Sequence, residues 1–470
     1  MQEDLTTSTQ PAKRETLATR LGFIMLSVGC AVGLGNVWRF PYICGKYGGG
    51  YFVLLYFIFL AMLGLPVLLM ELSVGRAGKS NMVGAFGKLA ANGQKIWRGF
   101  AKFFFIGNVL LMMYYTTVSG WLFAYAHKYI SGSIMSFTTN EEIGQCFGSL
   151  TGSWQTSLIF MLFGVVVGTI LCCGSLQKTV ERSVKYMMMM LFVLLAVLVG
   201  KALTMDGALE GLKFYLVPSW DKFSQNMVET IFAALGQAFF TLSLGVGSME
   251  IFGSYLSGQK RSLVKESITI IVLDTVVAIG AGLVIFPACL TFKVDPNAGP
   301  GLIFVSLPHV FQQMASGRLW GALFFLFMAM AALTTIVAVF ENIIAYVVDE
   351  WKFSRKNAAL LVGTTIAILS LPCVFGFNLW SSFAPLGKGT CVLDLEDFIV
   401  SQNLLPLGGL CTVFFCTWKC GWGQKNFIAE AEHSYNGHFG PFFRLYTKYV
   451  LPMIVLIVFA FGYWSTFFSK

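Results

Sequence analysis

Two short stretches of the chain combine glycines with amide or hydroxyl side chains inside apolar segments. Residues 29–41 hold three glycines within seven positions and include Asn36, and residues 240–247 include Thr241 and Ser243. Each glycine weakens a helix by about 1 kcal/mol relative to alanine, so both stretches predict a break in a helix. Unwound backbone offers carbonyl oxygens to cations, and a half-helix N-terminus favours a carboxylate. The alternative interpretation is close helix packing through small residues.

The composition places these stretches in a membrane. Of the 470 residues, 12% are charged and 56% are apolar, and the mean hydropathy is +0.72. Soluble domains carry about 25% charged residues, which they need to cover their surface. A soluble enzyme, a nucleic-acid binder and a disordered chain are therefore excluded. The composition predicts an all-α polytopic membrane protein.

Eleven segments are long and apolar enough to cross the hydrocarbon core, which takes about 20 residues of helix. They are 21–43, 51–74, 103–126, 157–173, 187–204, 229–255, 268–291, 320–347, 358–377, 399–418 and 447–467. The run at 300–315 is too short and too polar to cross, and we expect a re-entrant or surface helix there. Basic clusters such as Lys260, Arg261 and Lys265 lie on the cytoplasmic side of the membrane if the N-terminus does. This predicts a cytoplasmic N-terminus and an outer C-terminus.

The two glycine-rich stretches fall in the first and sixth of eleven transmembrane helices. These helices occupy corresponding places in a five-plus-five inverted repeat. Interrupted helices at equivalent positions of two halves are typical of a transporter site. We therefore expect a cytoplasmic tail (1–20), a first repeat with spans 1–5 (21–204), a second repeat with spans 6–10 (229–418) and span 11 (447–467).

The first span also carries a long motif. The stretch Arg20-Leu21-Gly22 through Asn36-Val37-Trp38-Arg39-Phe40-Pro41, followed by Gly48-Gly49-Gly50, resembles the first-helix signature of the neurotransmitter:sodium symporters. The resemblance covers essentially the whole chain and is closest to the eleven-span bacterial amino-acid transporters of that family. It implies sodium-coupled uptake of a neutral, hydrophobic L-amino acid by alternating access, in the bacterial cytoplasmic (inner) membrane. It does not imply an enzyme.

The resemblance implies two sodium sites made of oxygen ligands, which suit a hard cation. The first uses the Ala31 carbonyl, Asn36, Thr241, Asp274 and the carboxylate of the substrate. The second uses the Gly29 and Val32 carbonyls with Ala331, Thr334 and Thr335.

The resemblance also implies a substrate site. Amino-acid carriers of the family have glycine at the position of Gly33, where monoamine carriers have Asp. The carboxylate would meet the Tyr115 hydroxyl and the Leu34 and Gly35 amides, beside Ala31 and Thr241. The side-chain pocket would be lined by Leu111, Phe240, Ser243, Val246, Thr335 and Val339. An apolar lining without a charge predicts rejection of charged side chains, and the small Val246 leaves room for an aromatic one.

Asp274 stands where animal members of the family carry Asn, beside their chloride site. A carboxylate in mid-membrane is a functional residue by default. We expect its charge to balance sodium, so that chloride is not required. Tyr56 and Gln237 keep other parts of the chloride-site pattern, which leaves chloride binding open. Protonation of Asp274 on the return step, which would couple proton antiport, is also open.

The gates are the last assignment from the resemblance. Arg39 and Asp397 would pair across a water layer outside, above Phe240 as a lid. Inside, Arg14 would pair with Asp349, near Tyr255.

Several residues depart from the family pattern or have no assigned partner. Leu17 replaces an inner-gate Trp, and residues 179–189 lack the Gly and Pro that help to unwind span five. Glu250 is a carboxylate where the leucine carrier is apolar. It could pair with a helix end, tune substrate size or bind a proton. Glu71 and Glu341 are expected to brace the interrupted helices.

The expected partners are an L-amino acid and the lipid bilayer, with no nucleic acid and no obligate protein partner. A membrane sensor that binds the amino acid without net transport is the alternative function. A membrane enzyme would need a nucleophile–base pair or a metal cluster, and the sequence offers no pattern for either.

Overall fold

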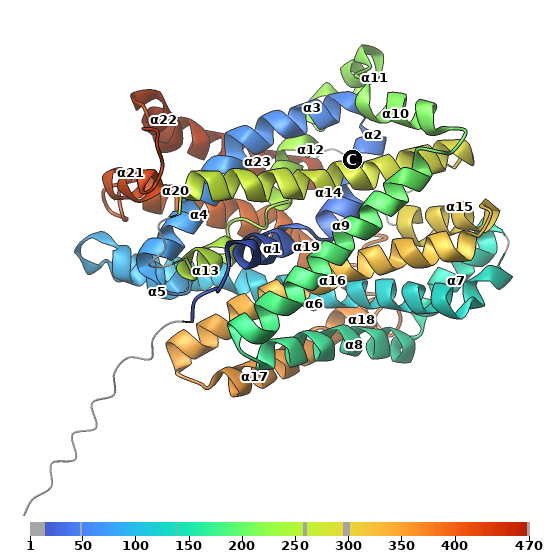
Figure 1. Cartoon of the computed structure of the whole chain (residues 1–470), viewed down its shortest axis with the longest axis horizontal. Helices are drawn as coiled ribbons and strands as arrows, with labels where there is room; N and C mark the ends of the chain where they lie inside the picture. Colours follow the sequence, from blue (N-terminus) through green and yellow to red (C-terminus); the bar gives the residue numbers. More distant parts are fainter. Residues whose placement is uncertain (1–14, 48, 138, 257–260, 295–300, 468–470) are drawn as a thin grey trace, which may run out of the picture.

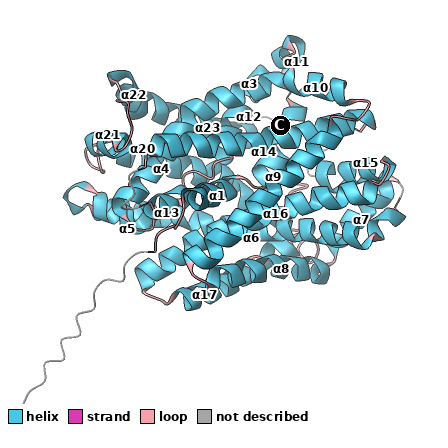
Figure 2. Ribbon diagram, viewed as in Figure 1, coloured by secondary structure: helices cyan, strands magenta, loops and turns pink. Residues whose placement is uncertain are grey.

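The computed structural model describes residues 15–47, 49–137, 139–256, 261–294 and 301–467. These residues are helical almost throughout, as Figure 2 shows. In this part of the chain the only strand-like pairing is a single bridge between Gly49 and Pro218. The architecture confirms the predicted all-α membrane fold.

Nine helices of the described chain are long and apolar enough to cross a membrane. They are Gly50–Gly78 (α3, η2 and α4), Lys95–Ser131 (α6), Trp154–Cys173 (α8), Leu176–Ala202 (η5 and α9), Leu263–Thr291 (α14), Gly317–Trp351 (α16), Arg355–Phe375 (α17 and α18), Val392–Thr417 (α19, η7 and α20) and Pro441–Trp464 (α22, η8 and α23). Shorter helices connect them: Met82–Leu89 (α5), Asn140–Gly152 (α7), Ala208–Leu216 (α10), Trp220–Gln225 (α11) and Gln424–Glu432 (α21).

The two predicted interruptions are confirmed. Helix α1 (Arg20–Ala31) is followed, after three residues, by Gly35–Lys46 (η1 and α2), and the two halves are bent by 55°. Helix α12 (Met227–Phe240) ends before the turn 241–247, and α13 (Ser248–Ser254) begins after it. Counted as one broken span each, these pairs are consistent with eleven spans.

The second break is fixed by backbone conformations that glycine adopts readily. Gly245 and Gly247 have φ angles of +96° and +77°. Ser243, which lies nearer to the end of α12, has a φ angle of +51°. A Cβ atom on Gly245 would lie 2.1 Å from the Leu405 carbonyl oxygen. Both the φ angle and this approach exclude a side chain.

Most spans extend beyond their predicted ends. Helix α6 begins at Lys95 rather than 103, and the fifth span begins at Leu176 rather than 187. The prediction counted only apolar residues, whereas long polar side chains continue a helix toward the aqueous interface. The fifth span opens with a π-helical stretch, η5 (Leu176–Glu181), which overlaps the start of the segment that lacks Gly and Pro. Residues 302–313 form the short helices η6 (Leu302–Ser306) and α15 (Leu307–Gln313), in line with a non-spanning segment.

Helix α1 lies near the middle of the bundle (Figure 1), where it packs against α9, α14 and α16. The half-helix η1 packs against α14, and α13 packs against α4 (Leu65–Gly78). Both breaks are therefore surrounded by long, continuous helices. These helices carry the other predicted site residues: Tyr115 is on α6, Asp274 on α14 and Thr335 on α16.

The break in the sixth span gives a stability prediction. Gly245→Ala should lower the free energy of unfolding by about 1–3 kcal/mol, because it introduces both a strained φ angle and a clash with the Leu405 carbonyl. The thermal unfolding midpoint of the purified protein in detergent measures this. Gly236→Ala is the matched control, since no atom lies within 4 Å of a Cβ there. An equal unfolding midpoint for the two variants would contradict the conclusion that Gly245 excludes a side chain.

Candidate functional site

Asp274 joins both broken helices to α14. The Asn36 amide donates from Nδ2 to Asp274 Oδ1 at 2.8 Å, and the Thr241 hydroxyl donates to Asp274 Oδ2 at 2.9 Å. Asn36 Nδ2 also lies 3.0 Å from Thr241 Oγ1. All three side chains are buried. A buried carboxylate is costly without donors, and charge-assisted hydrogen bonds offset part of that cost.

Asn36 also organises the first break. Its Oδ1 accepts from the Gly33 amide at 3.1 Å, so the side chain replaces a partner that the interrupted helix lacks. Ala31 is the last residue of α1, and Leu34 and Gly35 open the next half-helix. Backbone groups at such ends lack intrahelical partners and are available to a ligand.

A second cluster of oxygen atoms forms where α1 meets α16. The Thr335 hydroxyl lies 3.2 Å from the Gly29 carbonyl oxygen, 3.0 Å from that of Val32 and 3.1 Å from that of Ala331. The neighbouring Thr334 hydroxyl lies 2.9 Å from the Ala331 carbonyl oxygen. One hydroxyl proton serves only one acceptor at a time. The cluster is therefore rich in oxygen lone pairs, which suits a hard cation.

Gly33 lies between these two clusters. A Cβ atom on Gly33 would be 2.7 Å from the Tyr115 hydroxyl and 2.9 Å from Thr335 Oγ1. The Tyr115 hydroxyl is buried and has no hydrogen-bond partner among the described residues. A buried hydroxyl without a partner is unusual. It marks a position where a ligand acceptor would be stabilised.

The predicted side-chain pocket is made of neighbouring positions on these elements. Leu111 is one helical turn before Tyr115 on α6, and Val339 is one turn after Thr335 on α16; both are buried. Val246 packs on α6, where a Cβ on Gly107 would lie 2.6 Å from its Cγ1. At the break, the Ser243 hydroxyl lies 3.5 Å from the Cys30 carbonyl oxygen.

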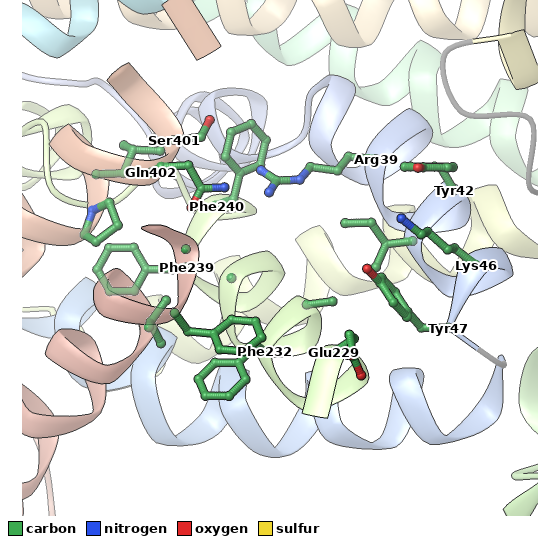
Figure 3. Close-up of a pocket in the computed structure, with 18 residues that line it drawn as sticks. Arg39, Tyr42, Lys46, Tyr47, Glu229, Phe232, Phe239, Phe240, Ser401 and Gln402 are labelled. Atoms are coloured by element: carbon green, nitrogen blue, oxygen red, sulfur yellow. The ribbon is translucent and has the colours of Figure 1, made fainter. Parts of the chain in front are cut away.

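A cavity of about 380 Å³ opens on the other side of Phe240 (Figure 3). Residues of α2, α12, η7, α20 and α23 line it. The Arg39 guanidinium lies 4.4 Å from the centre of the Phe240 ring, within cation–π range. The same ring lies close to Gly35, where a Cβ would be 2.8 Å from its Cε1 atom. Phe240 thus lines this cavity and also lies against Gly35, two residues from Gly33.

The structure does not bring Arg39 and Asp397 into direct contact. Asp397 accepts instead from the Ser401 hydroxyl at 2.6 Å. No ion pair joins Arg39 and Asp397 within the part of the chain that is described. The predicted pairing through water stays a prediction.

At the end of the bundle predicted to face the cytoplasm, polar contacts link several segments. Arg14 lies outside the described residues. Asp349 Oδ2 accepts from the Asn81 backbone and side-chain nitrogens at 2.9 and 3.0 Å. The Tyr255 hydroxyl donates to Glu341 at 2.6 Å, and Arg355 donates to the same carboxylate at 3.1 Å.

The N-terminal segment is held to the fifth span at this end. Glu181 accepts from the Ala18 amide at 2.8 Å and from the Thr19 amide and hydroxyl at 3.1 and 2.7 Å. Because Glu181 is the last residue of η5, the start of the first span is tied to the π-helical stretch.

The sequence alone did not identify Asn108 or the Glu341–Arg355 pair. The Asn108 amide donates to the Val246 carbonyl at 2.7 Å and accepts from Ser248 and Asn342 at 3.1 and 3.0 Å. An amide inside an otherwise apolar helix is the signal that could have found it. Glu71 does brace the second break, since it accepts from the Gly245 amide at 2.6 Å.

Comparisons with known proteins decide the family. The profile described as the sodium:neurotransmitter symporter family matches residues 14–156 and 142–467. The chain belongs to this family. As a sodium:neurotransmitter symporter it is a sodium-dependent membrane transporter and not an enzyme.

Similar proteins cover nearly the whole chain. An uncharacterized sodium-dependent transporter of Haemophilus influenzae is 34% identical over 96% of this chain and 99% of its own. Another uncharacterized sodium-dependent transporter, YhdH of Bacillus subtilis, is 34% identical over 94% of this chain and 96% of its own. The crystal structure of MhsT in complex with L-phenylalanine has a TM-score of 0.85 and 35% identity, covering 96% of this chain and 100% of that one.

Thr335→Ala tests the oxygen cluster between α1 and α16. Loss of the hydroxyl should weaken sodium binding by about 1.5–3 kcal/mol, roughly ten- to a hundredfold, if it acts like other contacts to charge. Stabilisation of the purified protein against heat, titrated with sodium chloride against potassium chloride, measures it. Thr335→Ser keeps the hydroxyl and should behave as the unmodified protein. An Ala variant with unchanged sodium dependence would remove Thr335 from any sodium site.

Proposed function

We propose that this transporter couples sodium entry to the uptake of a neutral, hydrophobic L-amino acid by alternating access. The observation that carries the proposal is the Tyr115 hydroxyl, buried and without a partner, facing the bare backbone of Gly33. A carboxylate placed there would accept from this hydroxyl and from the Leu34 and Gly35 amides, at the start of a half-helix that favours negative charge.

Two sodium ions would bind beside that carboxylate. The first would lie among Ala31, Asn36, Thr241 and Asp274, together with the substrate carboxylate. The second would lie among the Gly29 and Val32 carbonyls, Ala331, Thr334 and Thr335. The three carbonyl oxygens already within 3.2 Å of the Thr335 hydroxyl support the second site. Sodium shared with the substrate carboxylate would make the two ligands stabilise the same state.

Chloride would not be required, because Asp274 supplies a fixed negative charge at the first site. Its two carboxylate oxygens accept from Asn36 and Thr241, so the charge is held next to the proposed ligands. No other protein group in that proposed ligand set is charged. This charge would balance one sodium ion without an anion from solution.

The substrate side chain would lie against Leu111, Val246 and Val339, beside Phe240, Ser243 and Thr335. These groups carry no charge, which favours an uncharged side chain. The similarity to MhsT, whose structure was solved with L-phenylalanine, supports an amino acid with a hydrophobic side chain, aromatic ones included, as the substrate class.

Access would alternate between the two ends of the bundle. Phe240, under Arg39, would close the path to the outer cavity, with Asp397 joining through water. The contacts of Asp349 and of Tyr255 with Glu341 would close the inner end, with Arg14 as an additional partner. We place the N-terminus on the cytoplasmic side and the C-terminus on the outer side of the bacterial inner membrane. Residues 21–204 and 229–418 would form the two inverted repeats.

Uptake by the purified protein in proteoliposomes tests the function. An inward sodium gradient should drive accumulation of a labelled hydrophobic amino acid, and a potassium gradient should not. Competition by each of the other standard amino acids then defines the substrate. Saturable binding without accumulation would contradict transport and would favour the sensor interpretation.

Tyr115→Phe tests the carboxylate contact. Removal of a hydroxyl that donates to a charged group should weaken substrate affinity by about 1.5–3 kcal/mol, roughly ten- to a hundredfold. Equilibrium binding of the labelled substrate in sodium measures it. Tyr114→Phe alters the adjacent hydroxyl, which is also buried without a partner, and should have the smaller effect. The reverse order would refute the assignment of Tyr115.

Asp274→Asn tests the fixed charge. The variant loses the carboxylate that would balance sodium, so uptake should fall in chloride-free gluconate buffer and recover as chloride is added. The unmodified protein should take up substrate equally in both buffers. A folded variant that transports at the same rate with and without chloride would refute this role.

A further inference from the structure

Glu250 is a carboxyl group without a partner in the interior of the protein. It is the third residue of α13, and its side chain is fully buried. Neither of its carboxyl oxygens has a hydrogen-bond partner among the described residues. Buried carboxyls are normally paired or hydrogen-bonded, so this group needs an explanation.

Close packing of α13 on α4 places Glu250 beside a second carboxyl. A Cβ on Gly75 of α4 would lie 1.8 Å from the Glu250 carbonyl oxygen, and one on Gly253 would lie 2.4 Å from that of Leu72. Glu71 is one turn before Gly75 on the same face of α4. Both glutamates therefore lie at the packing contact between α4 and α13.

Glu71 holds the break in the sixth span. Its Oε1 accepts from the Gly245 amide at 2.6 Å, while its Oε2 is buried and has no partner. The hydrogen bond from a backbone N–H stabilises the ionised form of Glu71. The uncommitted oxygens of both carboxyls therefore lie in one buried region between α4 and α13.

The basic side chain that follows Glu71 on α4 is engaged elsewhere. Arg76, on α4, donates to Glu430 and to the Arg261 carbonyl. On α16, Glu341 pairs with Arg355 and Tyr255. Among the described residues neither Glu71 nor Glu250 takes part in an ion pair.

Three cysteines lie on helices that pack against α4 or α13. Cys411 and Cys416 are on α20 (Leu405–Thr417), and Cys30 is on α1. All three are buried free cysteines. A neutral thiol supplies no positive charge, so these cysteines do not compensate two carboxylates.

We propose that Glu71 and Glu250 form a proton-binding site in which Glu250 holds the proton while Glu71 is ionised. Two like charges in a low-dielectric interior cannot both persist without a counter-charge, and a bound proton removes one of them. A proton fits better than a metal ion, because only Glu71 Oε2 and the two Glu250 oxygens are uncommitted. Sodium would need a larger oxygen shell.

This site is separate from the proposed amino-acid and sodium sites, and it acts on the geometry of the sixth span. With Glu250 protonated, α4 and α13 stay in backbone contact at Gly75 and Gly253. Loss of the proton places two negative charges across that contact. Proton release is thereby coupled to separation of α13 from α4 and to the position of Gly245.

Infrared difference spectroscopy of the purified full-length protein in lipid bilayers tests the proposal without requiring transport. A protonated carboxyl has a carbonyl-stretch band that a carboxylate lacks. At neutral pH the unmodified protein should show such a band, and Glu250→Gln should lose it. Glu250→Asp should move the band rather than remove it, which covers the case in which the Gln variant does not fold.

Two further variants test whether the proton is shared between Glu71 and Glu250. In Glu71→Gln the like charge is gone, so the Glu250 band should titrate at lower pH than in the unmodified protein. The matched control is Glu266→Gln, a buried glutamate that is ion-paired with Arg20 at 2.8 Å and should leave the band unchanged.

Three results would overturn the proposal. The first is a neutral-pH spectrum that is identical in the unmodified protein and in both Glu250 variants. The second is a Glu250 band whose titration ignores Glu71→Gln. The third is a band that disappears when sodium chloride replaces potassium chloride at constant pH, which would assign the site to sodium.

Discussion

The carboxylate of Asp274 is the interaction on which the centre of this protein depends. It accepts from Asn36, in the half-helix after the first break, and from Thr241, in the turn of the second. Two chain segments that lack regular helix are thus fixed to one continuous helix, α14. The same carboxylate therefore fixes the position of both breaks relative to α14, and the Asn36–Thr241 contact joins the breaks to each other.

Side chains replace the hydrogen bonds that the broken helices lose. In a membrane interior each unpaired backbone group is costly, because water is not available as a partner. The Gln237 amide donates to the Gly35 carbonyl at 3.0 Å, Asn108 to that of Val246 at 2.7 Å, and Glu71 accepts from Gly245 at 2.6 Å. These three buried side chains therefore satisfy backbone groups at the two breaks.

The sequence was sufficient for the helical fold and for both interruptions, because glycine spacing and hydropathy are local signals. The family motif led to Asp274, Thr335 and Tyr115, and the structure brings these residues together around Gly33. The partners of Asn108 and the Glu341–Arg355 contact were not predictable in this way. They join residues of different helices, and no local pattern records which helices become neighbours.

The π-helical stretch η5 changes how the fifth span should be understood. Gly and Pro are absent where the family pattern led us to expect a composition suited to unwinding, yet the backbone there already departs from α geometry. A π turn holds one residue more than an α turn, and such turns occur frequently at functional sites. The additional residue allows the helical hydrogen bonds to shift by one position without breaking the helix. Such a shift can shorten or lengthen the segment that Glu181 joins to Thr19. The capacity of η5 to change length thus depends on which hydrogen bonds its backbone forms. A search of the sequence for helix-breaking residues does not detect this.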